Sequence, residues 1–200
     1  MIARAGLSWL RRASDGLKSR WRNFYYRALG VNIEGYVWLR AIEISRNWSD
    51  IVLEKSVALD QGVVLLCSGP PQANKLIIRS GTYVNRYTIF DAHQQLEIGH
   101  DCMIGPHCYI TDADHGTEPG HSVKEQSMKK SPVILEDEVW LGSHVVVLPG
   151  VRIGKGAVVG AGSVVTRDLP SNSVSFGQPA RVVRMRSPER EPVAELAAHG

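Results

Sequence analysis

The sequence predicts an all-β solenoid of short strands and turns, preceded by one helix. Between residues 133 and 166 an aliphatic residue recurs every six positions, at Leu135, Leu141, Val147, Ile153, Val159 and Val165. The residue four places after each of the first five is small or β-branched. A helix would space its apolar residues by three and four, and a strand would alternate strictly, so a period of six fits neither alone. It fits stacked coils, in which three six-residue units complete one turn and neighbouring coils bury each other.

An amphipathic helix is predicted before the solenoid, over residues 7–29. Its apolar face holds Leu10, Leu17, Trp21, Phe24 and Ala28, and Gly16 is a candidate break. This stripe is predicted to cover the open end of the solenoid, because an exposed sheet edge needs protection. The alternative is peripheral attachment of residues 1–29 to the anionic inner membrane surface, which basic helices with aromatic residues favour.

The six-residue repeat continues through most of the remaining chain. It is carried by Ile33, Leu53, Leu59, Leu65, Ile78, Val84, Phe90, Ile98, Ile104 and Ile110. Residues 111–132 break it, because they are polar and hold two glycines and two prolines. An extruded loop is therefore predicted there, and long insertions in compact repeats are often functional. The predicted organisation is a helical segment at 1–30, a solenoid at 31–186 and a flexible tail at 187–200.

Composition excludes several classes of protein. The net charge is +3, of which residues 1–27 contribute +6, so the basic character is local and does not indicate a nucleic-acid-binding domain. No apolar run is long enough to span a membrane and no signal peptide is recognisable, so a cytoplasmic location is the default prediction. The three cysteines form no disulfide framework, and Cys102 and Cys108 occupy the small-residue position of the repeat.

The segment VWLGSHVVVLPGVRIGKGAVVGAGSVVTRDLPSN, followed by GQPARVVR, resembles the closing half of the galactoside, maltose and other sugar O-acetyltransferases. These belong to the hexapeptide-repeat acyltransferases. The resemblance is strong over residues 78–186 and weak before them. It implies a left-handed parallel β-helix of hexapeptide repeats, and the hand rests on the resemblance alone, since parallel crossovers are nearly always right-handed. It also implies acetyl-CoA as co-substrate, no required metal, and a homotrimer with active sites between subunits.

His115 is the predicted general base. It follows Asp112 and Asp114 in the extruded loop, and histidine is the side chain that most often takes this role. The resemblance strengthens the assignment, because sugar O-acetyltransferases carry their catalytic histidine at this place. Asp112, Asp114 and Glu125 all stay open as the partner of its second ring nitrogen. His121 in the same loop is a weaker candidate.

The resemblance also implies the binding residues. Asn85 and Asp91 match positions that contact the sugar, although both residue types also favour turns. The backbone N–H of Ser143 matches the donor that stabilises the oxyanion. The pantetheine arm of CoA is expected along Trp140, Gly142, Ser143, Gly160 and Ala161, and the phosphates near Thr166, Arg167, Arg181 and Arg184.

The sequence therefore predicts an acetyl-CoA-dependent O-acetyltransferase that acts in one ternary complex on a small-molecule or glycan acceptor. The opening helix and the DADHGTEPG loop resemble acetyltransferases of surface-polysaccharide synthesis, such as the colanic acid, O-antigen and capsule group. Two alternatives are a non-catalytic β-solenoid scaffold and a metalloenzyme like the γ-class carbonic anhydrases. The spacing of His93, His100, His107 and His115 does not match the latter family.

Overall fold

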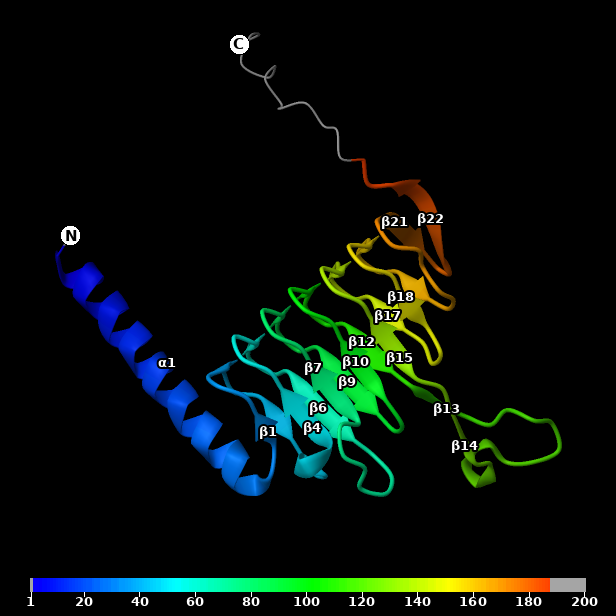
Figure 1. Cartoon of the computed structure of the whole chain (residues 1–200), viewed down its shortest axis with the longest axis horizontal. Helices are drawn as coiled ribbons and strands as arrows, with labels where there is room; N and C mark the ends of the chain where they lie inside the picture. Colours follow the sequence, from blue (N-terminus) through cyan, green and yellow to red (C-terminus); the bar gives the residue numbers. More distant parts are fainter. Residues whose placement is uncertain (1, 188–200) are drawn as a thin grey trace, which may run out of the picture.

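A long helix leads into a stack of coils that forms a three-sided prism (Figure 1). The computed structural model describes residues 2–187, and side chains from residue 14 onward. Helix α1 (Ile2–Leu29) is followed by three parallel sheets that run along the prism, one on each side. The chain winds as a left-handed parallel β-helix, and one strand of each sheet belongs to every coil.

The strands of the three sheets alternate regularly along the chain. Sheet A contains β1 (Asn32–Ile33), β4 (Ile51–Leu53), β7 (Leu76–Ile78), β10 (Leu96–Ile98), β15 (Val133–Leu135) and β18 (Arg152–Ile153). Sheet B contains β2 (Trp38–Leu39), β5 (Ala58–Leu59), β8 (Tyr83–Val84), β11 (Met103–Ile104), β16 (Trp140–Leu141), β19 (Val158–Val159), β21 (Ser173–Gly177) and β22 (Ala180–Met185). Sheet C contains β3 (Glu43–Ile44), β6 (Val64–Cys67), β9 (Ile89–Ala92), β12 (Tyr109–Thr111), β17 (Val146–Val147) and β20 (Val164–Val165).

The aliphatic residues of the six-residue repeat fill the lumen of the prism. Leu135, Leu141 and Ile153 are completely buried, and so are the small residues at the corners, such as Val139 and Ala157. Register joins Trp140 to Val158 and Val146 to Val164, which are three six-residue units apart. The predicted coil of three units is therefore confirmed. Burying each such aliphatic side chain contributes about 1.5–3 kcal/mol.

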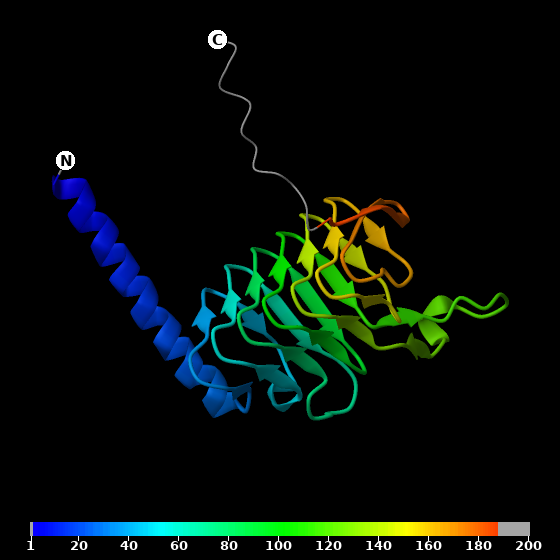
Figure 2. The ribbon, with the colours of Figure 1, turned by 45° about the horizontal axis from the view of Figure 1, so that its top comes forward.

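All long excursions leave the prism at one corner, the turn from sheet C to sheet A, here called the excursion corner. The 3-10 helix η1 (Trp48–Asp50) and the bulge at 68–75 lie in successive coils at this corner. The next coil turns here through residues 93–95, and the hairpin at 112–131 lies in the coil after that. The hairpin consists of β13 (Ala113–His115) and β14 (Met128–Lys130), with η2 (Val123–Glu125) between them. Figure 2 shows the hairpin projecting away from the stack. The predicted extruded loop is confirmed and is a paired element.

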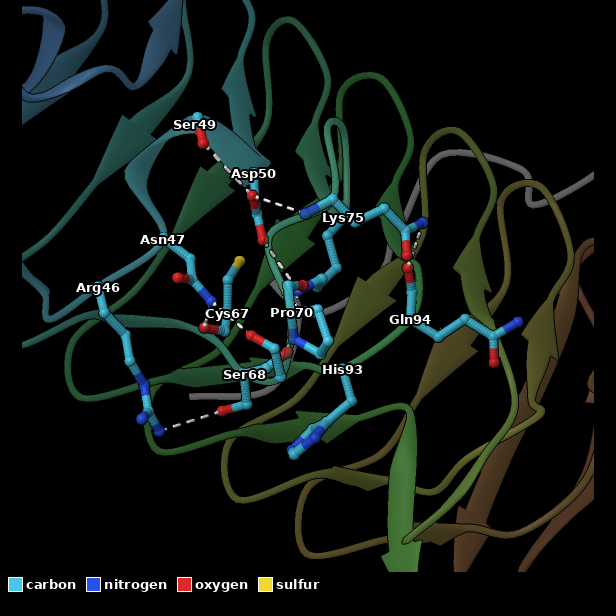
Figure 3. A network of polar contacts seen from close by, with 12 residues as sticks. Arg46, Asn47, Ser49, Asp50, Cys67, Ser68, Pro70, Lys75, His93 and Gln94 are labelled. Atoms are coloured by element: carbon cyan, nitrogen blue, oxygen red, sulfur yellow. Dashed lines mark hydrogen bonds and ion pairs between the residues drawn. The ribbon is translucent and has the colours of Figure 1, made fainter.

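A buried ion pair holds the base of the excursion corner (Figure 3). The Lys75 Nζ lies 2.8 Å from Asp50 Oδ2, and both side chains are only 1% exposed. Lys75 also donates to the carbonyls of Ser68 and Pro70. Asp50 Oδ1 in turn accepts the backbone N–H of Gln72. This network ties two successive coils together.

Helix α1 covers the first coil, but with the face opposite to the predicted one. Ser19 and Asn23 are buried and exchange hydrogen bonds with the backbone of Val37 and Leu39, the open edge of sheet B. Tyr26 packs into the core and donates to the carbonyl of Ile42. The prediction that the apolar stripe covers the solenoid is wrong, because edge N–H and C=O groups need polar partners. The helix also continues through Gly16.

The last coil is closed by the antiparallel pair β21 and β22, of which β21 extends sheet B. Of the predicted tail at 187–200, all but Ser187 lies outside the described residues. In the described part of the chain, no helix combines the length and the apolar character needed to cross a bilayer.

Removing one partner of the buried pair should cost more than removing both. We expect Lys75→Met to lower the free energy of unfolding by about 3–5 kcal/mol, because the carboxylate of Asp50 stays buried without a counter-charge. The double variant Asp50→Asn/Lys75→Met should recover part of this loss in a urea titration. A Lys75→Met protein within about 0.5 kcal/mol of wild type would contradict the structural role of the pair.

The three cysteines should be inert in the folded protein. All are buried and free, and burial raises the pKa of Cys67 to about 12 and that of Cys102 to about 11. Burial also raises the pKa of Cys108. Because a raised pKa keeps the thiol protonated, we expect no fast reaction with an aromatic disulfide reagent at about pH 8. All three thiols should react after denaturation, and fast labelling of the native protein would refute the burial.

Candidate functional site

His115 is the last residue of strand β13, which pairs with β14 in the hairpin. His115 lies opposite Met128 in the register of β13 and β14. Gly116 follows, and a Cβ at this position would lie 2.7 Å from Gln126 Oε1, so only glycine fits the packing. Gln126 donates to the carbonyls of Glu118 and His121 and accepts the N–H of Glu118. The loop beyond His115 is therefore organised by one glutamine, a role that the sequence did not indicate.

Asp112 anchors the base of the hairpin. Its carboxylate is fully buried and accepts the backbone N–H groups of His93, Gln94 and Gln95 at 2.6–2.7 Å. The carbonyl of Asp112 accepts the N–H of Ser131, which closes the hairpin. The carboxylate of Asp112 thus binds the backbone of the previous coil. Asp112 is not a partner of His115 within one chain, because it is buried and both its carboxylate oxygens already accept backbone N–H groups that would otherwise be unpaired.

The other two candidate partners are not in contact with His115 either. Asp114 is its neighbour in β13, and adjacent strand residues point to opposite sides. Glu125 lies in η2 and is exposed. Within residues 14–187, the exposed imidazole of His115 makes no side-chain hydrogen bond or ion pair. One chain therefore presents this ring outward with both nitrogens free to meet other groups.

Asp91 lies beside the hairpin in a small polar cluster on the outer side of sheet C. Its carboxylate accepts the hydroxyl of Tyr109 at 3.0 Å and lies 3.3 Å from His93 Nε2. Burial and the neighbouring Asp91 carboxylate raise the pKa of Tyr109, so its hydroxyl stays a donor. The sequence did not indicate His93 or Tyr109. They meet Asp91 because β12 stacks on β9 and pairs Thr111 with Asp91, a register that only the folded chain shows. We call Asp91, His93, Tyr109 and His115 the hairpin half-site.

A second group of predicted residues lies in the turns from sheet B to sheet C. Register stacks Asn85, Gly142 and Gly160 at equivalent positions of this corner, since Val84, Leu141 and Val159 precede them in paired strands. A Cβ on Gly142 would lie 2.6 Å from the backbone nitrogen of Ala161, so the coils touch here. The Ser143 carbonyl accepts the N–H of Gly162, while its own N–H has no acceptor among the described residues. We call Asn85, Gly142, Ser143, Gly160 and Ala161 the turn half-site.

Asn85 behaves as a turn residue within one chain. Its side-chain oxygen accepts the backbone N–H of Arg86 at 2.8 Å, a contact that asparagine commonly makes in turns. The side chain is nevertheless half-buried at the edge of the turn half-site.

Trp140 lies on sheet B beside the turn half-site, whereas the predicted phosphate ligands lie in two separate places, in β22 and at the excursion corner. Trp140 is half-exposed on sheet B and lines a hollow of about 380 Å³ together with Met103, Val158, Val174 and Arg184. The guanidinium groups of Arg181 and Arg184 contact only backbone carbonyls of their own strand. Thr166 and Arg167 are exposed at the excursion corner, after β20. Within the described residues none of these three arginines has an acidic partner, so their charges are available to an anion.

The two half-sites lie at different corners of the prism. Ser143 belongs to the turn between β16 and β17, whereas His115 belongs to the hairpin between β12 and β15. His93, His100 and His107 lie at three different corners, and His107 stacks on His144 of the next coil with ring centroids 4.9 Å apart. One chain therefore does not bring the predicted general base and the predicted oxyanion donor together.

Comparison with known proteins identifies this arrangement of coils and hairpin. Residues 132–167 match the family model described as "Bacterial transferase hexapeptide (six repeats)". A maltose O-acetyltransferase from Clostridium difficile 630 superposes with a TM-score of 0.59 and 31% identity, covering 66% of this chain and 68% of that structure. The chain belongs to the hexapeptide-repeat transferase family.

Two further relatives share part of this chain. The galactoside O-acetyltransferase of Lactococcus lactis is 42% identical over 52% of this chain and 50% of its own length. The chain thus spans about half the length of that curated relative. A hexapeptide-repeat acetyltransferase from Vibrio cholerae O1 biovar eltor, solved with acetyl coenzyme A, has a TM-score of 0.54 and 30% identity, covering 60% of this chain and 64% of its own.

Neutralising Asp112 should loosen the hairpin without unfolding the prism. Asp112→Asn replaces an acceptor oxygen by an NH₂ group that faces backbone donors, and each unsatisfied buried group costs about 1–3 kcal/mol. We expect faster hydrogen exchange at the amides of His93, Gln94 and Gln95, measured by mass spectrometry. Asp114→Asn, the same change on the exposed strand of the hairpin, is the matched control and should leave exchange unchanged. Equal exchange in both variants would contradict the anchoring role.

Proposed function

We propose that the protein is an acetyl-CoA-dependent O-acetyltransferase that moves an acetyl group to a sugar hydroxyl. The observation that carries the proposal is the exposed imidazole of His115, on a hairpin that Asp112 anchors at its base and Gln126 organises beyond the imidazole. Membership of a transferase family whose relatives are named galactoside and maltose O-acetyltransferases supports the chemistry.

In the proposed reaction, His115 accepts the proton of the acceptor hydroxyl as its oxygen attacks the carbonyl carbon of acetyl-CoA. The carbon–sulfur bond then breaks, and the imidazolium returns the proton to the departing thiolate of CoA. Transfer is direct, within one ternary complex. The unpaired N–H of Ser143 is suited to stabilise the oxyanion, because a fixed backbone donor needs no reorganisation during the reaction.

Acetyl-CoA is proposed to lie along the stacked turns. Gly142 and Gly160 have no side chains to obstruct the pantetheine arm, and Ala161 and Trp140 supply apolar surface. The free charges of Arg167, Arg181 and Arg184, with Thr166, are placed to meet phosphates. Acetyl-CoA bound to the Vibrio cholerae acetyltransferase supports this choice of donor. No metal takes part in the proposed mechanism.

The acceptor is proposed to meet Asp91 and Asn85. Tyr109 and His93 keep the carboxylate of Asp91 at the outer surface of sheet C, where it can accept hydrogen bonds from sugar hydroxyls. We favour a sugar of a surface polysaccharide, because the DADHGTEPG hairpin and the opening helix resemble enzymes of that group.

A homotrimer is proposed to assemble the active site. The outer surface of sheet B carries the exposed Tyr83, Met103 and Trp140, whereas the outer surface of sheet A carries ion pairs such as Arg79–Glu97 and Arg152–Glu136. An apolar side next to a charged side suits a prism that buries part of its surface against neighbours. Since His115 and Ser143 lie at different corners of one chain, the neighbour's hairpin would complete each site.

The non-catalytic scaffold remains the second candidate, and fold alone never decides between them. It is favoured by the exposed outer face of α1, which could recruit the protein to other components. The metalloenzyme alternative requires histidines from two subunits to converge, and the hairpin that carries His115 gives it no additional support. Acetyl-CoA binding separates these candidates from the transferase.

His115 should be needed for transfer and not for donor binding. We expect His115→Ala to bind acetyl-CoA with wild-type affinity in calorimetry and to lose about 10²–10⁴-fold in kcat on a responsive sugar acceptor, as removal of a general base predicts. His121→Ala, an exposed histidine of the same loop, is the matched control and should keep full activity. The acceptors to screen are galactosides, maltose and nucleotide sugars.

Absence of acetyl-CoA binding to the wild-type protein would refute the donor and with it the proposed activity. Loss of activity in His121→Ala but not in His115→Ala would overturn the assignment of the base while leaving the transferase intact. A monomer in light scattering would contradict the shared active site.

A further inference from the structure

The outer face of α1 is strongly apolar from residue 17 onward, although nothing among the described residues covers it. Leu17, Trp21 and Phe24 are 66%, 65% and 64% exposed, and Tyr25 is half-exposed beside them. The rings of Trp21 and Phe24 lie 5.8 Å apart, so these side chains form one continuous patch. Exposed apolar residues are normal singly, but four large ones on a single helix face indicate an interaction surface.

The opposite face of the same helix explains why this patch is free. Ser19 and Asn23 bind the backbone at the open edge of sheet B, and Arg27 donates to the carbonyls of Ile33 and Gly35. The polar face of α1 therefore covers the open end of the solenoid. An isolated capping helix would gain solubility from a polar outer face, and this helix has the reverse arrangement.

Positive charge borders the patch. Lys18 and Arg20 are exposed next to Leu17 and Trp21, and neither forms an ion pair among the described residues. At the level of sequence, residues 1–27 hold seven basic residues and a single acid, Asp15. Aromatic and aliphatic side chains flanked by lysine and arginine are the combination that binds the interface of anionic bilayers.

We propose that the patch Leu17, Trp21, Phe24 and Tyr25, with Lys18 and Arg20, docks α1 in the plane of an anionic phospholipid surface. Tryptophan and tyrosine favour the headgroup level, where the ring is apolar and its polar atom stays hydrated. Lysine and arginine meet the lipid phosphates, because the negative potential of such a surface attracts cations. A second copy of this helix is a poorer occupant, because the same cations would then face each other.

The position of α1 leaves the candidate site accessible in the docked state. Figures 1 and 2 both show the helix at the N-terminal end of the stack, diverging from the coils, with the hairpin projecting elsewhere. A membrane on the outer face of α1 would therefore meet the end of the prism and leave the hairpin and the turns of sheets B and C open. This inference does not depend on the proposed transferase activity.

Flotation of the full chain with vesicles tests the proposal. Wild-type protein should float with phosphatidylcholine vesicles that contain about one third phosphatidylglycerol, bind pure phosphatidylcholine vesicles at least tenfold more weakly, and be released by high salt. Trp21→Ser/Phe24→Ser and Lys18→Glu/Arg20→Glu should each lower the partition coefficient on the anionic vesicles by about tenfold or more. The matched control is Val123→Ser/Lys124→Glu, the same kinds of change at exposed positions of the hairpin, and it should bind like wild type.

Circular dichroism and size-exclusion light scattering on the same variants keep the outcomes distinct. Folded variants of unchanged mass that no longer float would support docking through this face. Wild-type protein that ignores anionic vesicles, or α1 variants that float as well as the control, would overturn the proposal. A fall in oligomeric mass for Trp21→Ser/Phe24→Ser, without any vesicle binding by wild type, would assign the patch to a second copy instead.

Discussion

One inward aliphatic side chain on each flat side of every coil is the constraint on which the rest of the structure depends. Ile78, Val84 and Phe90 illustrate it in one coil, where all three are fully buried. A single coil cannot exclude water from its own lumen, so each needs a neighbour above and below. The two ends must then be closed, which α1 does through Ser19 and Asn23 at one end and β21 and β22 do at the other.

The same constraint explains where the chemistry lies. Flat sides cannot accept inserted residues without breaking the ladder, so every excursion leaves at a corner, where backbone pairing is already interrupted. The excursion corner is stiffened by buried charge, with Lys75 on Asp50 and the Asp112 carboxylate on three backbone N–H groups. A reactive side chain such as His115 can then project from the prism and still be held in place.

Much of the fold could be predicted because the residues that fill the lumen recur at a fixed period of six. The interruption of this period at residues 111–132 indicates the segment that leaves the solenoid. The site was less predictable. Asp112 lies close to His115 along the chain, yet its carboxylate accepts the backbone N–H of His93 in the previous coil. Tyr109 and His93 meet at Asp91 only because strands β9 and β12 stack in one register, which sequence distance does not reveal.

By itself, the sequence determined the number of units per coil, the residues that fill the lumen, the extruded loop at 111–132 and the amphipathic character of the opening helix, because each follows from local periodicity or its interruption. Only the tertiary structure decided which face of α1 covers the solenoid. The open edge of sheet B presents N–H and C=O groups, and Ser19 and Asn23 satisfy them better than Trp21 or Phe24 could. Backbone hydrogen bonding at an edge is a property of the assembled coil, so the periodicity of the helix alone could not reveal that its apolar face turns outward.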